Sequence, residues 1–191
     1  MNLPNKLTLL RIILVPFFVF FLMAGHSGVF GLLALLIFAV ASLTDLLDGK
    51  IARSRGLVTT FGKLMDPLAD KILVMSAMIC FVALKLAPAW AVIVILTREF
   101  LVTSLRLIAA GEGLVIAADN WGKIKTVTQM VWIIWVLLWL WLASSPLTLP
   151  AGFDVLGRGI AAVLMGASVF FTLLSGFNYV WKNRALLFSD M

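Results

Sequence analysis

Six apolar stretches separated by short polar connections occupy most of this 191-residue chain. Each is close to the roughly 20 apolar residues that an α-helix needs to cross a bilayer. Because a backbone inside a bilayer must satisfy its hydrogen bonds internally, stretches of this length favour helices. The sequence therefore predicts an all-α integral membrane bundle of six transmembrane helices, at residues 7–23, 29–52, 61–84, 89–110, 122–142 and 155–181.

The composition excludes an ordinary soluble protein, because 63% of the residues are hydrophobic and only 13% are charged. We expect one membrane domain over residues 1–191. A net charge of +6 would favour nucleic acid as the partner of a soluble protein. Here the basic residues cluster at expected helix ends, so membrane lipids and phosphate-bearing substrates are the expected partners and nucleic acid is not.

The distribution of Lys and Arg predicts the orientation of the bundle. With both termini in the cytoplasm, thirteen of the fifteen Lys and Arg residues lie on the cytoplasmic side, and only Lys85 and Arg158 lie on the other. Membrane proteins concentrate Lys and Arg in cytoplasmic connections. We therefore expect a multi-pass membrane protein with both termini in the cytoplasm.

Four aspartates stand close together in this apolar chain. Asp45 and Asp48 are three residues apart, and Asp66 and Asp70 are four apart, so each pair shares one face of its expected helix. Unpaired carboxylates are costly in a bilayer, which favours a functional site over charges at the membrane surface. Divalent cations that prefer oxygen ligands (Mg²⁺, Mn²⁺ or Ca²⁺) would keep these side chains ionised.

The spacing of these residues has a close parallel. The pattern Asp45-x2-Asp48-Gly49-x2-Ala52-Arg53-x8-Gly62-x3-Asp66-x3-Asp70 resembles the signature of the CDP-alcohol phosphotransferases. The resemblance implies that an alcohol attacks the β-phosphate of a CDP-linked lipid and releases CMP. It further implies two Mg²⁺ or Mn²⁺ ions, with Asp45, Asp48 and Asp66 as metal ligands. Asp70 takes the position of the catalytic base and of a further metal ligand.

The same resemblance predicts a site for the CDP-lipid. Gly49 and Gly62 would leave room for a ligand, and Arg53 can pair with a phosphate. An ordinary close contact between helices is the alternative role of Gly49 and Ala52. The expected CDP-lipid-binding residues are Asn5, Thr8, Gly49, Ala52, Arg53 and Gly62.

Three further segments bear on the acceptor alcohol. The start of the chain (residues 3–11), residues 97–106 and residues 115–129 resemble the phosphatidylglycerophosphate synthase branch of this family. That branch uses CDP-diacylglycerol and sn-glycerol 3-phosphate. Basic residues near the cytoplasmic ends of two expected helices independently favour a phosphate-bearing acceptor, although charges that merely reach the membrane surface are the alternative. The expected acceptor-binding residues are Arg98, Arg106, Lys123 and Lys125, with Glu99 either orienting or neutralising Arg106.

Some alternatives stay open at the level of sequence. The same chemistry could use phosphatidylglycerol, inositol phosphate or serine as the acceptor. A cation transporter is the alternative from a different functional class, although the sequence shows no inverted repeat. The family resemblance also implies a homodimer, but no particular residue indicates one.

Overall fold

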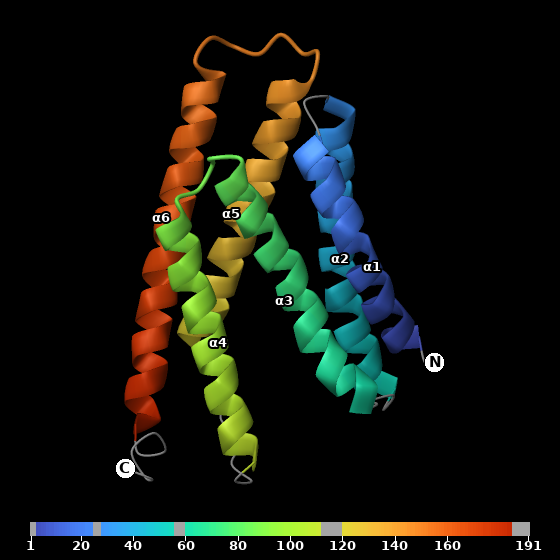
Figure 1. The fold of residues 1–191 in the computed structure, drawn as a ribbon, viewed down its shortest axis with the longest axis vertical. Helices are drawn as coiled ribbons and strands as arrows, with labels where there is room; N and C mark the ends of the chain where they lie inside the picture. Colours follow the sequence, from blue (N-terminus) through green and yellow to red (C-terminus); the bar gives the residue numbers. More distant parts are fainter. Residues whose placement is uncertain (1–2, 25–27, 56–59, 112–119, 185–191) are drawn as a thin grey trace. The chain divides into compact units, whose positions relative to one another are not determined.

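The computed structural model describes residues 3–24, 28–55, 60–111 and 120–184. Within helices, the side chains of residues 3, 4, 45–55, 60–64, 66, 67, 70 and 110 lie outside the description. The described residues form six α-helices and no strand (Figure 1). The helices are α1 (Leu3–Ala24), α2 (Gly28–Arg55), α3 (Thr60–Ala83), α4 (Ala89–Gly111), α5 (Asn120–Ser144) and α6 (Phe153–Lys182).

The predicted helices are confirmed in number and order. Five of the six begin within two residues of the expected position, whereas α1 begins at Leu3, four residues before the expected start at Leu7. Pro4 does not prevent this early start, because a proline in the first turn removes an N–H that would have no intrahelical acceptor. The early start places Asn5 on the helix, together with Thr8, which the predicted range already included.

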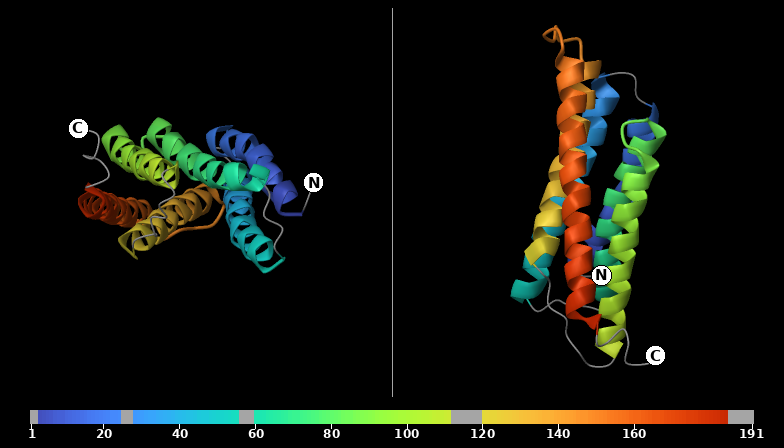
Figure 2. Two further views of the ribbon diagram at one scale, coloured as in Figure 1. Left: turned by 90° about the horizontal axis from the view of Figure 1, so that it is seen from below. Right: turned by 90° about the vertical axis from the view of Figure 1, so that its left-hand side faces the viewer.

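The chain divides into two compact units. Unit 1 contains Met1–Lys85 and Ile133–Gly157, and unit 2 contains Leu86–Trp132 and Arg158–Met191. In unit 1, α1 packs against both α2 and α3 (Figures 1 and 2). In unit 2, α4 lies beside α6 (Figure 2), and the first half of α5 contacts both of these helices. The expectation of one domain concerns how the whole chain folds, and it stays a prediction.

Glycines allow α2 to approach α5 closely inside unit 1. A Cβ atom added at Gly28 would lie 3.0 Å from the carbonyl oxygen of Ser144, and one added at Gly31 would lie 3.1 Å from Cα of Trp141. Both neighbours belong to the backbone of α5, which cannot move aside as a side chain can. Small residues spaced along one face are a common way for membrane helices to pack closely.

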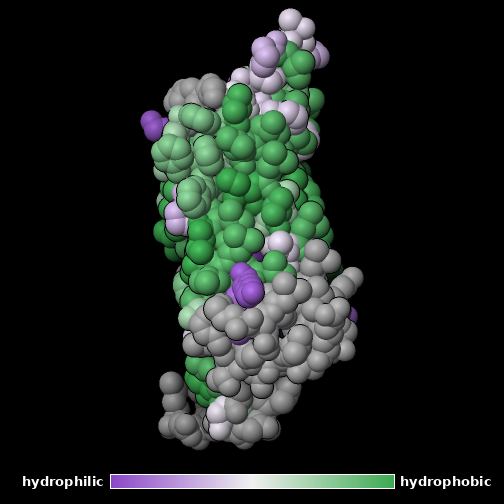
Figure 3. Space-filling model, turned by 90° about the vertical axis from the view of Figure 1, so that its right-hand side faces the viewer, coloured by the Kyte–Doolittle hydropathy of each residue, from purple (hydrophilic) through white to green (hydrophobic). Residues whose placement is uncertain are grey.

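Three of the described helices are long and apolar enough to cross a membrane, namely Asn5–Ala24, Asn120–Ser144 and Phe153–Lys182. Shorter apolar stretches occur at Gly28–Thr44 and Lys71–Ala83. Large apolar side chains such as Phe17 and Phe20 of α1 are exposed. The face in Figure 3 is hydrophobic over most of its described part. These features indicate a membrane protein, because exposing such apolar surfaces to water costs free energy, whereas contact with lipid does not.

We predict that Gly31→Leu destabilises the protein, because the new side chain must separate α2 from the backbone of α5. Overpacking of this kind costs about 1–3 kcal/mol. Thermal unfolding in detergent should show a lower apparent Tm. Gly159→Leu is the matched control, because no described atom lies within 4 Å of a Cβ at that position. Equal Tm changes in the two variants would contradict the close approach at Gly31.

Candidate functional site

The four aspartates lie on two helices that are consecutive in unit 1. Asp45 and Asp48 belong to the last three turns of α2, and Asp66 and Asp70 belong to the first three turns of α3. Only residues 56–59 separate the two helices, so the aspartate-bearing ends are neighbours at the same end of unit 1 (Figure 1). The predicted helical spacing within each pair is confirmed at the level of the backbone.

The side chains of these aspartates lie outside the described residues, as do those of Gly49, Ala52, Arg53 and Gly62. Their predicted roles in binding metal and CDP-lipid therefore stay predictions. Among the side chains that are described, no group of three or more His, Cys, Asp or Glu residues lies together.

A line of buried polar side chains runs along α1. Asn5, Thr8 and Arg11 follow one another at intervals of three residues and are 8%, 0% and 1% exposed. Residues three apart on a helix lie on one face. Nε of Arg11 donates a hydrogen bond to the carbonyl oxygen of Ala41 on α2, at 3.1 Å. The face that carries Asn5 and Thr8 is thus turned into unit 1, where α1 packs against the two aspartate-bearing helices.

A cluster of three charged side chains joins α4 to α5 in unit 2. Oε1 of Glu99 accepts one hydrogen bond from Nζ of Lys125 at 2.8 Å and another from Nη1 of Arg98 at 2.9 Å. The Lys125 side chain is 3% exposed and the Arg98 side chain is 14% exposed. Burying a charged side chain costs much less when it is paired, so Glu99 allows both cations to be buried between the helices. The cluster keeps a formal charge of +1.

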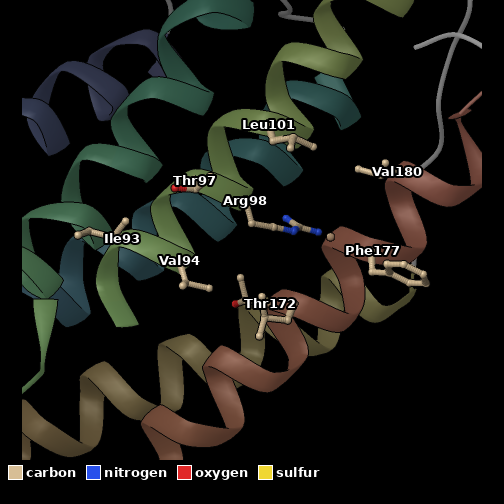
Figure 4. Close-up of a pocket in the computed structure, with 10 residues that line it drawn as sticks. Ile93, Val94, Thr97, Arg98, Leu101, Thr172, Phe177 and Val180 are labelled. Carbon is tan, nitrogen blue, oxygen red and sulfur yellow. The ribbon is translucent and has the colours of Figure 1, made fainter. Parts of the chain in front are cut away.

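Glycines from two other helices surround Arg98. A Cβ atom at Gly122 of α5 would lie 3.3 Å from Nη2 of Arg98, and one at Gly176 of α6 would lie 3.1 Å from its Cγ. Nε of Arg98 is buried without a hydrogen-bond partner among the described residues. Figure 4 shows the side chain extending from α4 toward the segment of α6 that carries Thr172 and Phe177.

An apolar groove of about 460 Å³ lies between α4 and α6 beside Arg98. Ile93 and Leu101 of α4 and Phe177 and Val180 of α6 are among its lining residues (Figure 4). Among the described residues that line this groove, Arg98 is the one that carries a charge. The groove is therefore mainly apolar, whereas the neighbouring cluster of Arg98, Glu99 and Lys125 is charged.

The remaining two expected acceptor-binding residues have different surroundings. Arg106 is exposed, and its Cζ lies 5.6 Å from the centre of the Tyr179 ring of α6, which is a cation–π arrangement. Lys123 is exposed on α5. The structure thus joins Arg98 and Lys125 through Glu99, and it places Arg106 against α6.

The prediction that Glu99 orients or neutralises Arg106 is wrong, because Glu99 pairs with Arg98 and Lys125. Seven residues are about two helical turns, or roughly 10 Å along the axis, which is too far for a direct ion pair. Lys125 comes within reach because α5 packs against α4. The sequence also did not predict the contact of Gly176 with Arg98, because no motif in α6 marks this glycine.

Chemically, the cluster suits an anion. Two cations share one carboxylate, so positive charge remains for a ligand, and Arg and Lys are the side chains that proteins use to bind phosphate. The four carboxylates of α2 and α3 suit the opposite kind of ligand, a divalent cation. The chain therefore carries an acidic set on α2 and α3 (Asp45, Asp48, Asp66 and Asp70) and a basic set on α4 and α5 (Arg98, Arg106, Lys123 and Lys125).

Known proteins resemble the chain over nearly its whole length. A family model described as CDP-alcohol phosphatidyltransferase matches residues 1–174. A Bacillus subtilis protein named CDP-diacylglycerol–glycerol-3-phosphate 3-phosphatidyltransferase is 44% identical over 193 aligned residues, which cover 95% of each chain. A Mycobacterium tuberculosis protein named probable phosphatidylglycerophosphate synthase is 41% identical and covers 94% of this chain and 80% of its own. A Rickettsia typhi protein with the same name as the Bacillus relative is 35% identical, covering 93% and 94%.

We predict that Glu99→Gln destabilises the protein, because the buried Lys125 ammonium loses its counter-charge. Removing one partner of such a pair costs on the order of 2 kcal/mol, whereas removing both can be nearly neutral. The double variant Glu99→Gln/Lys125→Met should therefore regain most of the lost apparent Tm in a thermal unfolding measurement. Additive losses in the double variant would show that the two side chains do not depend on each other.

Proposed function

The chain belongs to the CDP-alcohol phosphatidyltransferase family, and from this premise we propose that it transfers a phosphatidyl group from CDP-diacylglycerol. The acceptor is sn-glycerol 3-phosphate, and the products are phosphatidylglycerol phosphate and CMP. The observation that carries the proposal is the Bacillus subtilis relative, whose name states this donor and acceptor and which is 44% identical over 95% of each chain.

In the proposed reaction, a hydroxyl oxygen of the acceptor forms a bond with the phosphatidyl phosphorus of CDP-diacylglycerol. The bond from that phosphorus to the oxygen shared with the cytidine-bearing phosphate breaks, and CMP leaves with its electron pair. Asp70 accepts the proton of the attacking hydroxyl, as expected of a carboxylate that acts as general base. No redox step and no further reactant are needed.

The acidic set is the proposed metal site, with Asp45, Asp48, Asp66 and Asp70 as ligands of two Mg²⁺ or Mn²⁺ ions. Two observations support it: each pair has helical spacing, and a connection of only four residues separates α2 from α3. When bound, such cations neutralise the charge of the diphosphate and stabilise the departing CMP. Asn5, Thr8, Gly49, Ala52, Arg53 and Gly62 are proposed to hold the CDP-lipid.

The basic set is the proposed site for the acceptor phosphate, with Arg98, Arg106, Lys123 and Lys125 as its residues. Support comes from the residual charge of the Arg98–Glu99–Lys125 cluster and from the exposure of Arg106 and Lys123. A site built around a phosphate should reject uncharged analogues strongly, because the residual positive charge of the site would be left without an anionic ligand.

All six helices are proposed to cross the bacterial cytoplasmic membrane, with both termini and the active site on the cytoplasmic side. The asymmetric distribution of Lys and Arg supports this orientation. The water-soluble acceptor and Mg²⁺ are both available on that side. A homodimer is also proposed, and the exposed apolar faces of the helices are compatible with one.

The test of the reaction is CMP release by purified protein in detergent, with CDP-diacylglycerol and Mg²⁺. We predict release that depends on sn-glycerol 3-phosphate and stops when EDTA removes the metal. Glycerol and phosphatidylglycerol serve as matched acceptors that lack the phosphate monoester. Release with another acceptor, such as inositol phosphate or serine, would replace the acceptor assignment. Metal flux into liposomes without any CMP release would instead favour a cation transporter.

We predict that Asp70→Asn lowers kcat by about 10²–10⁴-fold, which is the usual contribution of a general base. Binding of CDP-diacylglycerol should be largely retained, because Asp45, Asp48 and Asp66 remain. Asp48→Asn should instead remove both activity and metal-dependent binding of the CDP-lipid. Asp154→Asn is the control, since this residue lies in the first turn of α6 outside the signature. Wild-type kcat in Asp70→Asn would exclude Asp70 as the base.

A further inference from the structure

Gly176 on α6 lies against the side chain of Arg98. A Cβ atom at this position would approach Cγ of Arg98 to 3.1 Å and its Cβ to 4.0 Å. These are the atoms nearest to the backbone of α4, so they cannot swing away as freely as the guanidinium can. The missing side chain at Gly176 therefore leaves the space through which the stem of Arg98 passes.

This contact differs from those of other glycines in the chain. At Gly28 and Gly31 an added Cβ would meet the backbone of α5, which is ordinary close packing of helices. At Gly159 and Gly166, on the same helix as Gly176, no described atom lies within 4 Å of the added Cβ. Among the described glycines, an added Cβ atom would meet Arg98 only at Gly176 and Gly122.

The position of the stem controls the position of the guanidinium. Three bonds separate Cγ of Arg98 from Cζ, so a displacement of a few tenths of an ångström at Cγ is amplified at the charged end. Nη1 is fixed by its hydrogen bond to Glu99 at 2.9 Å, and Nη2 lies beside Gly122. A shifted stem must therefore either break the bond to Glu99 or bend the side chain away from a favourable rotamer.

We propose that Gly176 is a positioning residue of the acceptor-phosphate site, which acts by holding Arg98 in place. The proposal rests on the function proposed above, in which Arg98 binds the acceptor phosphate. It extends that function to a residue beyond the family match, which ends at residue 174. The role is indirect, because Gly176 itself has no side chain with which to bind a ligand.

The experiment compares Gly176→Ala with Gly166→Ala, each alone and in an Arg98→Ala background. For each protein we would measure kcat, KM for sn-glycerol 3-phosphate, KM for CDP-diacylglycerol and the apparent Tm. Gly176→Ala should raise KM for the acceptor about tenfold, since small misplacements of a binding group have large effects. KM for CDP-diacylglycerol should change less than about twofold. Gly166→Ala should change neither constant.

The Arg98→Ala background decides whether Arg98 transmits the effect. Without Cγ of Arg98, alanine at position 176 has nothing to displace, so it should cause no further rise in KM. The apparent Tm should likewise fall on Gly176→Ala only when Arg98 is present, because alanine is otherwise the better helix former. An equal effect of Gly176→Ala in both backgrounds, or equal effects on both KM values, would overturn the proposal.

The two proposals fail in different ways. If Arg98→Ala leaves KM for the acceptor unchanged, the assignment of Arg98 is wrong and the positioning role falls with it. If Arg98→Ala raises that KM and Gly176→Ala does not, the assignment stands and only the role of Gly176 is overturned. If sn-glycerol 3-phosphate supports no CMP release at all, the proposed reaction fails, and the role of Gly176 at its acceptor site is overturned as well. The Tm comparison would then report only on whether residues 98 and 176 are in contact.

Discussion

Charged side chains inside an apolar bundle need partners of opposite charge, and in unit 2 Glu99 provides one for two cations at once. Its carboxylate lies 2.8 Å from Nζ of Lys125 and 2.9 Å from Nη1 of Arg98. Without this anion, two neighbouring cations would repel each other in surroundings where water screens them poorly. Glu99 therefore fixes the distance between the two cations and ties α4 to α5.

One carboxylate between two cations also has a chemical consequence. A second carboxylate would leave the cluster neutral and unattractive to an anion, whereas no carboxylate would make burial of both cations too costly. With one carboxylate, the residual charge of +1 is enough to attract an anion, and both buried cations still have a counter-charge. An anionic ligand can then bind without first displacing Glu99, because Arg98 keeps N–H groups beyond the one that Glu99 accepts.

The sequence predicted the helices well because their apolar stretches are long and their connections short. Helix bounds agree within a few residues, and the earlier start of α1 reflects the tolerance of a first-turn proline. The candidate site was predictable only where motifs mark it. The spacing of the four aspartates can be read directly from the sequence, but the pairing of Glu99 with Lys125 cannot. Lys125 stands 26 residues away, and only the packing of α5 against α4 brings the two together.

Gly176 illustrates a deeper limit of sequence reasoning. A binding group leaves a signal because its chemistry is conspicuous, as a carboxylate is in an apolar helix. A residue that contributes space leaves no such signal, since glycine is common in membrane helices for reasons of packing. Gly157, Gly159, Gly166 and Gly176 all lie on α6, and nothing in the sequence distinguishes the last of them. The distinction appears only when the neighbour of each missing Cβ is known, and at Gly176 that neighbour is the charged side chain of Arg98.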